Sequence, residues 1–211
     1  MAAQAGCLSI VDSVTGLAGV ELLVDEWAAD VTYSGTQKCL SAPPGISLIT
    51  FSDKAAARVQ SRNTPVQSWF LDLSLLMAYW QVEGARTYHH TAPVNAMYGL
   101  HEALLMVKEE GIENAWQRHW DMHGLLAEGV RSLGLDFIVA AECRLPQLNL
   151  VRCPEGLDEA AVRRRLLEEY NLEIGAGLGA FAGKVWRIGL MGYSARRENV
   201  ELCISALRSC I

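Results

Sequence analysis

The stretch "VTYSGTQKCLSAPPGISLITFS" (Val31–Ser52) sets the pattern from which the fold of this chain can be predicted. Its β-rich start ends in a Ser-Gly-Thr-Gln turn, one lysine (Lys38) follows, and a second apolar run begins after Pro43-Pro44-Gly45. Apolar and β-branched runs bounded by Gly, Pro and Ser are typical of strands joined by a loop. We therefore predict strands at 31–34 and 47–51, with Lys38 just past the end of the first.

A strand is also predicted upstream, where the apolar run that starts at Cys7 ends in Asp12. Apolar residues followed by an acid at the strand's end are typical of buried parallel strands covered on both faces. The segment 19–30, which separates this strand from the one at 31–34, is long enough for a short crossover. The alternation predicts an α/β fold.

After Pro93 the apolar residues follow the spacing of helices instead of strands. Two long helices are predicted at 94–109 and 112–133, interrupted at Gly111. Shorter elements follow, namely strands near 137–139, 148–152, 172–175 and 185–190, and helices near 157–170 and 196–208. We place a domain boundary near residue 110, between a partial large domain (1–110) and a small α/β domain (111–211).

Asp12 and Lys38 are the residues at these strand ends that suggest chemistry. In an open parallel sheet, ligands bind beyond the carboxyl ends of the strands, so both side chains would face one crevice. Such a pair suits pyridoxal phosphate, because the lysine amine forms a Schiff base with the cofactor aldehyde and the carboxylate keeps the pyridine nitrogen protonated. The spacing alone leaves an alternative open, in which Asp12 caps a helix at Ser13-Val14 and Lys38 is an ordinary loop lysine.

The composition narrows the class of protein. Of the 211 residues 51% are hydrophobic and 20% are charged, which predicts a packed core. The net charge of −6 argues against nucleic-acid binding, and no apolar run is long and uninterrupted enough for a membrane span. Scattered cysteines and the absence of a signal-peptide pattern predict a reduced, cytoplasmic protein. The C-terminal Ser-Cys-Ile does not match the peroxisomal tripeptide, although a peroxisomal location stays open.

No metal site is predicted. His119 and His123 have the i, i+4 spacing of a zinc pair, but the glutamate of a His-Glu-x-x-His motif is missing and two tryptophans share the region. We expect this pair to be solvent-facing or packed. His89 and His90 are adjacent, so in a strand they would point to opposite faces and could not bind one metal together.

Three motifs, in order along the chain, resemble those of class V (fold type I) aminotransferases. "VDSVTGLAGVELLVDEWAADVTYSGTQKCLSAPPG" at 11–45 resembles the cofactor core with its lysine, "YHHTAP" at 88–93 the phosphate segment, and "GKVWRIGLMG" at 183–192 the arginine motif. The similarity extends over nearly the whole chain. Within that family it is nearest to the group that transfers amino groups from alanine or serine to glyoxylate.

The resemblance implies pyridoxal 5′-phosphate (PLP) as cofactor and assigns four residues to it. Lys38 would hold PLP covalently and move the proton between the substrate Cα and the cofactor C4′. Asp12 would pair with the pyridine nitrogen, Val14 would pack near the ring, and Gln37 would hydrogen-bond the phosphate.

Three further residues receive roles from the resemblance. Tyr88 and Thr91 would reach the phosphate of the partner subunit, because the family's sites lie at a homodimer interface. Arg187 would bind the substrate carboxylate, since a guanidinium pairs with a carboxylate through two parallel hydrogen bonds. Each also has a structural alternative: Tyr88 and Thr91 as ordinary residues before a helix, and Arg187 as a sheet-edge cation or ion-pair partner.

The function that the resemblance implies is transfer of an amino group from alanine or serine to glyoxylate or a similar 2-oxo acid. A lyase or desulfurase with the same cofactor is one alternative, because Cys39 adjoins Lys38. A non-catalytic fragment is another, because family members carry a long segment before the strand of Asp12 and this chain begins almost at that strand. We expect the N-terminal half of the usual fold to be lacking, through truncation or separate encoding.

An incomplete sheet has a consequence for stability. A sheet without its neighbours exposes apolar faces and an unpaired edge. Apolar burial contributes about 25 cal/mol per Å². Losing the contacts of several strands therefore removes an amount comparable with the roughly 5–15 kcal/mol by which a whole domain is stable. We predict that the part of the chain after about residue 110 folds more stably than the part before it.

Overall fold

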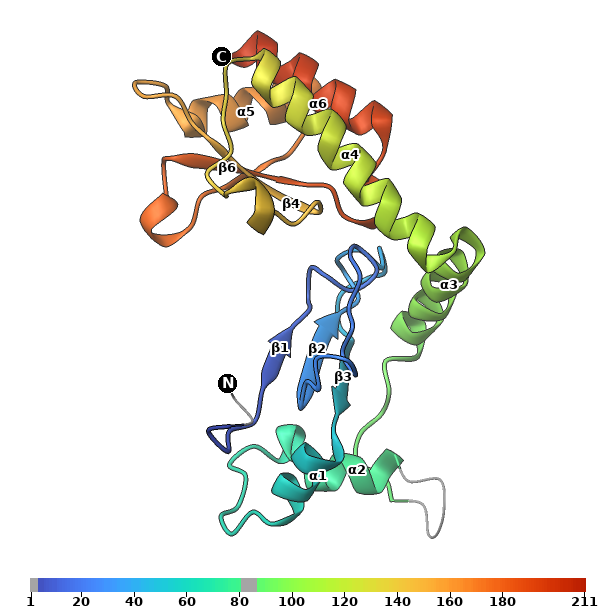
Figure 1. The fold of residues 1–211 in the computed structure, drawn as a ribbon. Helices are drawn as coiled ribbons and strands as arrows, with labels where there is room; N and C mark the ends of the chain where they lie inside the picture. The colour runs from blue at the N-terminus through green and yellow to red at the C-terminus, as the bar shows by residue number, and fades with distance from the viewer. Residues whose placement is uncertain (1–3, 81–86) are drawn as a thin grey trace.

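The computed structural model describes residues 4–80 and 87–211 and has two three-stranded sheets with helices around them. The first sheet lies in the N-terminal part of the chain and the second in the C-terminal part, and two long helices connect them along one side (Figure 1). This arrangement confirms the predicted α/β class. Within the described residues no helix is long and apolar enough to cross a membrane.

The first sheet consists of β1 (Ile10–Asp12), β2 (Val31–Gly35) and β3 (Ser47–Phe51), in the order β1-β2-β3. β1 and β2 are parallel, with Asp12 opposite Tyr33, whereas β3 is antiparallel to β2. The strands predicted at 31–34 and 47–51 are confirmed, and β1 is shorter than the predicted 7–12. The crossover predicted at 19–30 is confirmed, since β1 and β2 are parallel. It contains turns, such as the one closed by the bond from Trp27 N–H to Leu23 O, and no helix.

The prediction of a buried β1 is wrong. Ile10 is 68% exposed, and Ile49 and Tyr33 on the same face of the sheet are also exposed. Residues of α1 and of the segment 61–74 lie beside this face, and together with it they line a groove of about 680 Å³. The groove is lined mainly by apolar side chains, including Leu8, Ile10, Val31, Ile49, Phe51 and Leu71. The strand is apolar on a face that the described chain does not bury.

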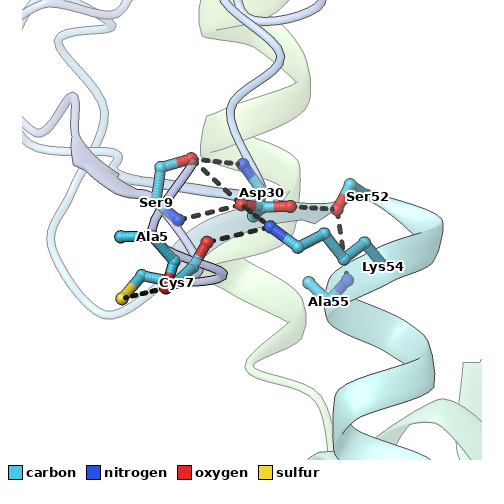
Figure 2. Close-up of polar contacts among 7 residues, drawn as sticks. All are labelled: Ala5, Cys7, Ser9, Asp30, Ser52, Lys54 and Ala55. Carbon is cyan, nitrogen blue, oxygen red and sulfur yellow. Dashed lines mark hydrogen bonds and ion pairs between the residues drawn. The ribbon is translucent and has the colours of Figure 1, made fainter. Parts of the chain in front are cut away.

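A buried carboxylate, Asp30, links the starts of β1 and β2 to the end of β3 (Figure 2). Lys38 follows β2 at the other end of the sheet. Asp30, which precedes β2, accepts hydrogen bonds from Ser9 N at 2.9 Å, Ser52 Oγ at 3.0 Å and Lys54 Nζ at 3.2 Å. The Ser9 hydroxyl accepts from the Asp30 N–H in return. The Ser9 backbone N–H is the main reason why the pKa of Asp30 falls to about 2.

Four helices lie between the two sheets in the sequence. α1 (Asp53–Gln60) begins where Ser52 Oγ accepts the Ala55 N–H, and α2 (Leu73–Trp80) follows a 3₁₀ turn at 69–71; the sequence had predicted neither helix. α3 (Val94–Glu110) and α4 (Ile112–Ser132) confirm the two long helices. Gly111 separates them with φ +85°, a conformation that favours glycine.

The second sheet consists of β4 (Leu148–Arg152), β5 (Gly175–Ala176) and β6 (Val185–Gly189), with β6 in the centre of an antiparallel arrangement. α5 (Glu159–Tyr170) and α6 (Arg197–Cys210) pack with α4 on one face of this sheet, and 3₁₀ turns lie at 141–143, 179–181 and 192–194 (Figure 1). The strand predicted near 137–139 is only an isolated bridge from Phe137 to Val151.

The two parts have hydrophobic clusters of unequal size. The larger one joins α4, α5 and α6 to the second sheet and includes the fully buried Leu126, Leu166, Trp186 and Leu207. The smaller one contains Ala18, Cys39, Leu40 and Leu100, and Met191 from the C-terminal part packs against it. A domain boundary near residue 110 remains our proposal, and the contact through Met191 shows where the two parts touch.

Candidate active site

Asp12 is the last residue of β1, and the loop of Lys38 follows the adjacent parallel strand β2 at the same end of the sheet. Its two carboxylate oxygens accept hydrogen bonds from different groups, Oδ1 from the Val14 N–H at 2.9 Å and Oδ2 from the Tyr33 hydroxyl at 2.8 Å. Tyr33 reaches Asp12 because it is its register partner on the adjacent parallel strand. The bond to Val14 is the capping contact of the structural alternative, although residues 13–19 form turns and no α-helix.

These bonds fix the charge state of Asp12. The Val14 N–H and then the Tyr33 hydroxyl stabilise the carboxylate, so the pKa of Asp12 lies below its usual value. The same contact raises the pKa of Tyr33, so its hydroxyl keeps its proton and remains the donor. At neutral pH the site therefore contains an exposed, oriented negative charge at the carboxyl end of β1.

Lys38 belongs to a tight loop that begins right after β2. The loop is closed by hydrogen bonds from Ser41 N to Lys38 O at 2.9 Å, and from Ala42 N to Thr36 O at 3.0 Å. The Thr36 side chain is fully buried and donates to Pro43 O, which fixes the far end of the loop. Lys38 itself is half-buried and takes part in none of the ion pairs among residues 4–80 and 87–211.

Gln37 and Val14 lie beside these two residues in the sequence. Gln37 is exposed and folds back over Gly35, since a Cβ added to that glycine would lie 2.8 Å from Gln37 Oε1. Val14 is half-buried and follows Asp12 by two residues. Because β1 and β2 are parallel neighbours, their carboxyl ends lie at the same end of the first sheet. The residues found there are Asp12, Val14, Gln37 and Lys38.

Arg187 lies in the middle of β6, between Leu150 of β4 and Gly175 of β5. Its side chain lies over Gly175, where a Cβ would be 3.3 Å from the guanidinium, and its Nε donates to Ala176 O at 2.6 Å. Arg187 is therefore in the central strand, not at a sheet edge as one alternative had it. It forms no ion pair with any residue that the structure describes.

Tyr88 and Thr91 lie together, with their hydroxyl oxygens 2.5 Å apart, and both are exposed. They lie shortly before α3 in the sequence, in residues that form neither helix nor strand. No described hydrogen bond joins either residue to Asp12, Gln37 or Lys38. The structure of the single chain therefore groups the candidate residues that follow β1 and β2, but it shows no contact between them and Tyr88 or Thr91.

The neighbouring His89 and His90 differ from the sequence prediction. They are not in a strand, and their Nδ1 atoms face each other at 2.8 Å instead of pointing to opposite sides. His89 also stacks on Trp69, with ring centroids 4.1 Å apart. No cluster of three or more metal-type ligands exists among residues 4–80 and 87–211.

Cys39, next to Lys38, is not activated as a nucleophile. It is buried, its Sγ donates to Thr15 O at 3.3 Å, and burial is the main cause that raises its pKa to about 11. A thiol attacks as the thiolate, so at neutral pH Cys39 has almost none of the reactive form. This removes the residue on which the desulfurase alternative depended.

The structure thus has an acid and a lysine loop at the carboxyl ends of two parallel strands, and an arginine in the central strand of a second sheet. The chain belongs to the class-V aminotransferases: the family model described as "Aminotransferase class-V" matches residues 1–202.

Individual relatives cover the same region. The chain is 44% identical over 207 residues to the alanine–glyoxylate aminotransferase of Rattus norvegicus, covering 97% of this chain and 50% of that protein. It is 37% identical over 222 residues to the (S)-ureidoglycine–glyoxylate transaminase of Bacillus subtilis, covering 97% and 53%. The crystal structure of an alanine–glyoxylate aminotransferase from Nostoc sp. matches with a TM-score of 0.95 and 47% identity over 99% of this chain and 55% of that one. The chain thus spans about half the length of the curated relatives it matches.

Proposed function

We propose that this chain is part of a PLP-dependent aminotransferase that moves an amino group from alanine or serine to glyoxylate or a similar 2-oxo acid. The observation that carries the proposal is the parallel pairing of β1 and β2, which brings the ionised Asp12 and the loop of Lys38 to the same end of the first sheet. Relatives named for glyoxylate transamination, at 37–44% identity, support the choice of substrate class.

The donor set fits PLP. A carboxylate that stays ionised can keep a pyridine nitrogen protonated, which is what makes the PLP ring withdraw electrons from a bound amino acid. Tyr33, donating to Asp12 Oδ2 at 2.8 Å, orients this carboxylate, and Val14 would pack near the ring. Gln37 offers an exposed amide for the phosphate, and Lys38 has no ion pair within the described chain to compete for its amine.

The other residues act on the substrate and its protons. Lys38 would be the group that removes the proton from the substrate Cα and delivers it at the cofactor C4′. Arg187 binds the substrate carboxylate with the guanidinium nitrogens that do not contact Ala176 O. Tyr88 and Thr91, exposed and side by side, would bind the phosphate in the site of a second subunit, so we expect a homodimer when the family's full fold is present.

The proposal is tested by trapping PLP on the purified chain with borohydride and mapping the modified peptide by mass spectrometry. We expect visible absorbance after PLP is added, a label on Lys38, and a change of the absorbance when alanine is added. Lys38→Arg should abolish the specific label. The matched control Lys108→Arg, an exposed lysine on α3, should retain it.

Two results would contradict the proposal. The absence of colour, or a label spread over surface lysines, would favour a non-catalytic fragment. A label on Lys38 whose absorbance neither alanine nor serine changes would favour another PLP reaction.

A further inference from the structure

The turn at Gly192 and Tyr193, just after β6, contacts both the loop of Lys38 and helix α4. In Figure 1 the chain leaves β6 and runs to the junction of the two sheets, beside α4. Because β6 carries Arg187, the backbone runs directly from Arg187 into this turn, which contacts the loop of Lys38 through a hydrogen bond. The contacts that hold it involve side chains that the proposed chemistry does not use.

His119 of α4 holds the turn from one side. It is 1% exposed, its Nδ1 lies 2.6 Å from Ala115 O, and its Nε2 lies 2.9 Å from the Gly192 N. A carbonyl only accepts and an amide N–H only donates, so Nδ1 carries the proton and Nε2 is the acceptor. The neutral ring with this one tautomer satisfies both contacts.

Arg118, the preceding residue on α4, holds the other polar group of Gly192. Its NH1 donates to Gly192 O at 2.7 Å and to Ala195 O at 3.2 Å. The remaining guanidinium nitrogens, Nε and NH2, bind both carboxylate oxygens of Glu110, at 2.5 and 2.9 Å, which fixes the orientation of the fork. Both the N–H and the C=O of Gly192 are therefore bound to α4.

The same turn contacts the Lys38 loop on its other side. The Tyr193 N–H donates to Ser41 Oγ at 2.8 Å, and Ser41 N in turn donates to Lys38 O at 2.9 Å. Gly192 lies so close that a Cβ added to it would overlap the Cys39 carbonyl and the Ser41 hydroxyl. The backbone after β6 is thus in direct contact with the backbone after Lys38.

We propose that His119 and Arg118 are positioning residues that hold the Gly192 turn against the Lys38 loop and thereby fix Arg187 relative to Lys38. The roles of Lys38 and Arg187 rest on the proposed function, whereas the coupling between the two loops does not. A substrate bound by its carboxylate at Arg187 must present its Cα to Lys38, and a shift of about 1 Å between such groups can lower a rate by about 100-fold. We call the set His119, Arg118, Gly192, Tyr193 and Ser41 the latch.

The test is hydrogen–deuterium exchange on the cofactor-free chain with two substitutions of one residue. His119→Asn puts its amide at the Nδ1 position and loses the acceptor for Gly192, whereas His119→Gln puts a carbonyl oxygen near the Nε2 position and keeps it. We expect His119→Asn to speed exchange by about 3- to 10-fold both in 189–194 and in 38–42, as loss of one hydrogen bond predicts. His119→Gln should restore protection of both segments.

A milder variant decides the question if His119→Asn does not fold. Ser41→Ala removes the acceptor of the Tyr193 N–H from an exposed position, and it should speed exchange at Tyr193 and also across the turn at Gly192. The matched control is Ser194→Ala, another exposed serine whose hydroxyl makes no hydrogen bond with the described residues. It should leave both segments unchanged.

Two outcomes overturn the proposal. If exchange rises in 189–194 alone, the latch does not reach the Lys38 loop. If it rises equally throughout α4, α6 and the second sheet, and His119→Gln does not rescue it, the role of His119 is only structural. Failure of the wild-type chain to bind PLP would contradict the proposed function and leave this measurement intact, because no exchange experiment requires the cofactor.

Discussion

The Tyr33 hydroxyl is a part of the candidate site that the sequence did not indicate. It donates to Asp12 Oδ2 and helps to lower the pKa of that carboxyl. In Tyr33→Phe we expect the pKa of Asp12 to rise while remaining below neutrality, because the Val14 N–H still binds Oδ1. NMR titration of the Asp12 carboxyl carbon measures this, with the exposed Tyr98→Phe as control. An unchanged pKa of Asp12 in Tyr33→Phe would show that the contact does not exist in solution.

His119 and His123 predict how stability depends on pH. Burial is the main cause that lowers the pKa of each below its ordinary value of 6.5, and the Arg118 and Arg144 cations lower it further. Contacts with Ala115 O and Asn149 Oδ1 oppose this effect, as does the charge of Glu110 near His119. The folded state therefore favours neutral rings, whereas the unfolded chain takes up protons below about pH 6.5.

We expect the contribution of these two histidines to the free energy of unfolding to be complete above pH 6.5. It should fall as the pH decreases from 6.5 towards their lowered pKa values in the folded state. Urea denaturation of the chain at pH 7.5, 6.5 and 5.5 measures this. His119→Gln should show a smaller loss over the same range, because one of the two titrating groups is gone. A stability that is constant from pH 7.5 to 5.5 would contradict the assigned neutral state.

At the scale of elements, α5 offers a matched pair of leucines that separates core packing from surface effects. Leu166 is fully buried in the large cluster, whereas the adjacent Leu167 is 49% exposed. Leu166→Ala should lower the free energy of unfolding by about 2–5 kcal/mol, and Leu167→Ala by less than about 1 kcal/mol. Chemical denaturation monitored by tryptophan fluorescence compares the two, and equal losses would contradict the packing described.

Local sequence signals predicted most of these elements because their causes are local. The strands at 31–34 and 47–51, the break at Gly111 and the helix start after Pro93 follow from turn chemistry and apolar spacing. The site was predictable to the extent that strand ends and motifs show it, as at Asp12 and Lys38.

The partners of these residues were not predictable. The Tyr193 N–H and Ser41 Oγ are 152 positions apart, and His119 and Gly192 are 73 apart, so no window of sequence contains both members of either contact. The sequence also predicted β1 to be buried, since its apolar residues indicate a face to be covered but not whether the described chain covers it. The register that places Tyr33 opposite Asp12 also could not be predicted, because it depends on how β1 and β2 pair in the folded chain.

For the whole molecule, the unequal clusters predict unequal resistance to proteases. The second sheet packs with α4, α5 and α6 into a continuous core, while the first sheet keeps an exposed apolar face and only a small cluster. Limited proteolysis at low protease concentration should therefore cut the part before residue 110 first and leave a fragment that begins near α4. Mass spectrometry of the fragments identifies the sites, and even protection from residue 4 onward would contradict this order.

Position 192 accommodates only glycine while the turn after β6 lies against the loop of Lys38. No side chain fits at that position, since even one methyl group would overlap two atoms of the neighbouring loop. Another amino acid at this position would therefore require the loop of Cys39 and Ser41 to move away from the turn. The residue found at this position in a related sequence would therefore indicate whether the turn after β6 can still lie against the loop of Lys38.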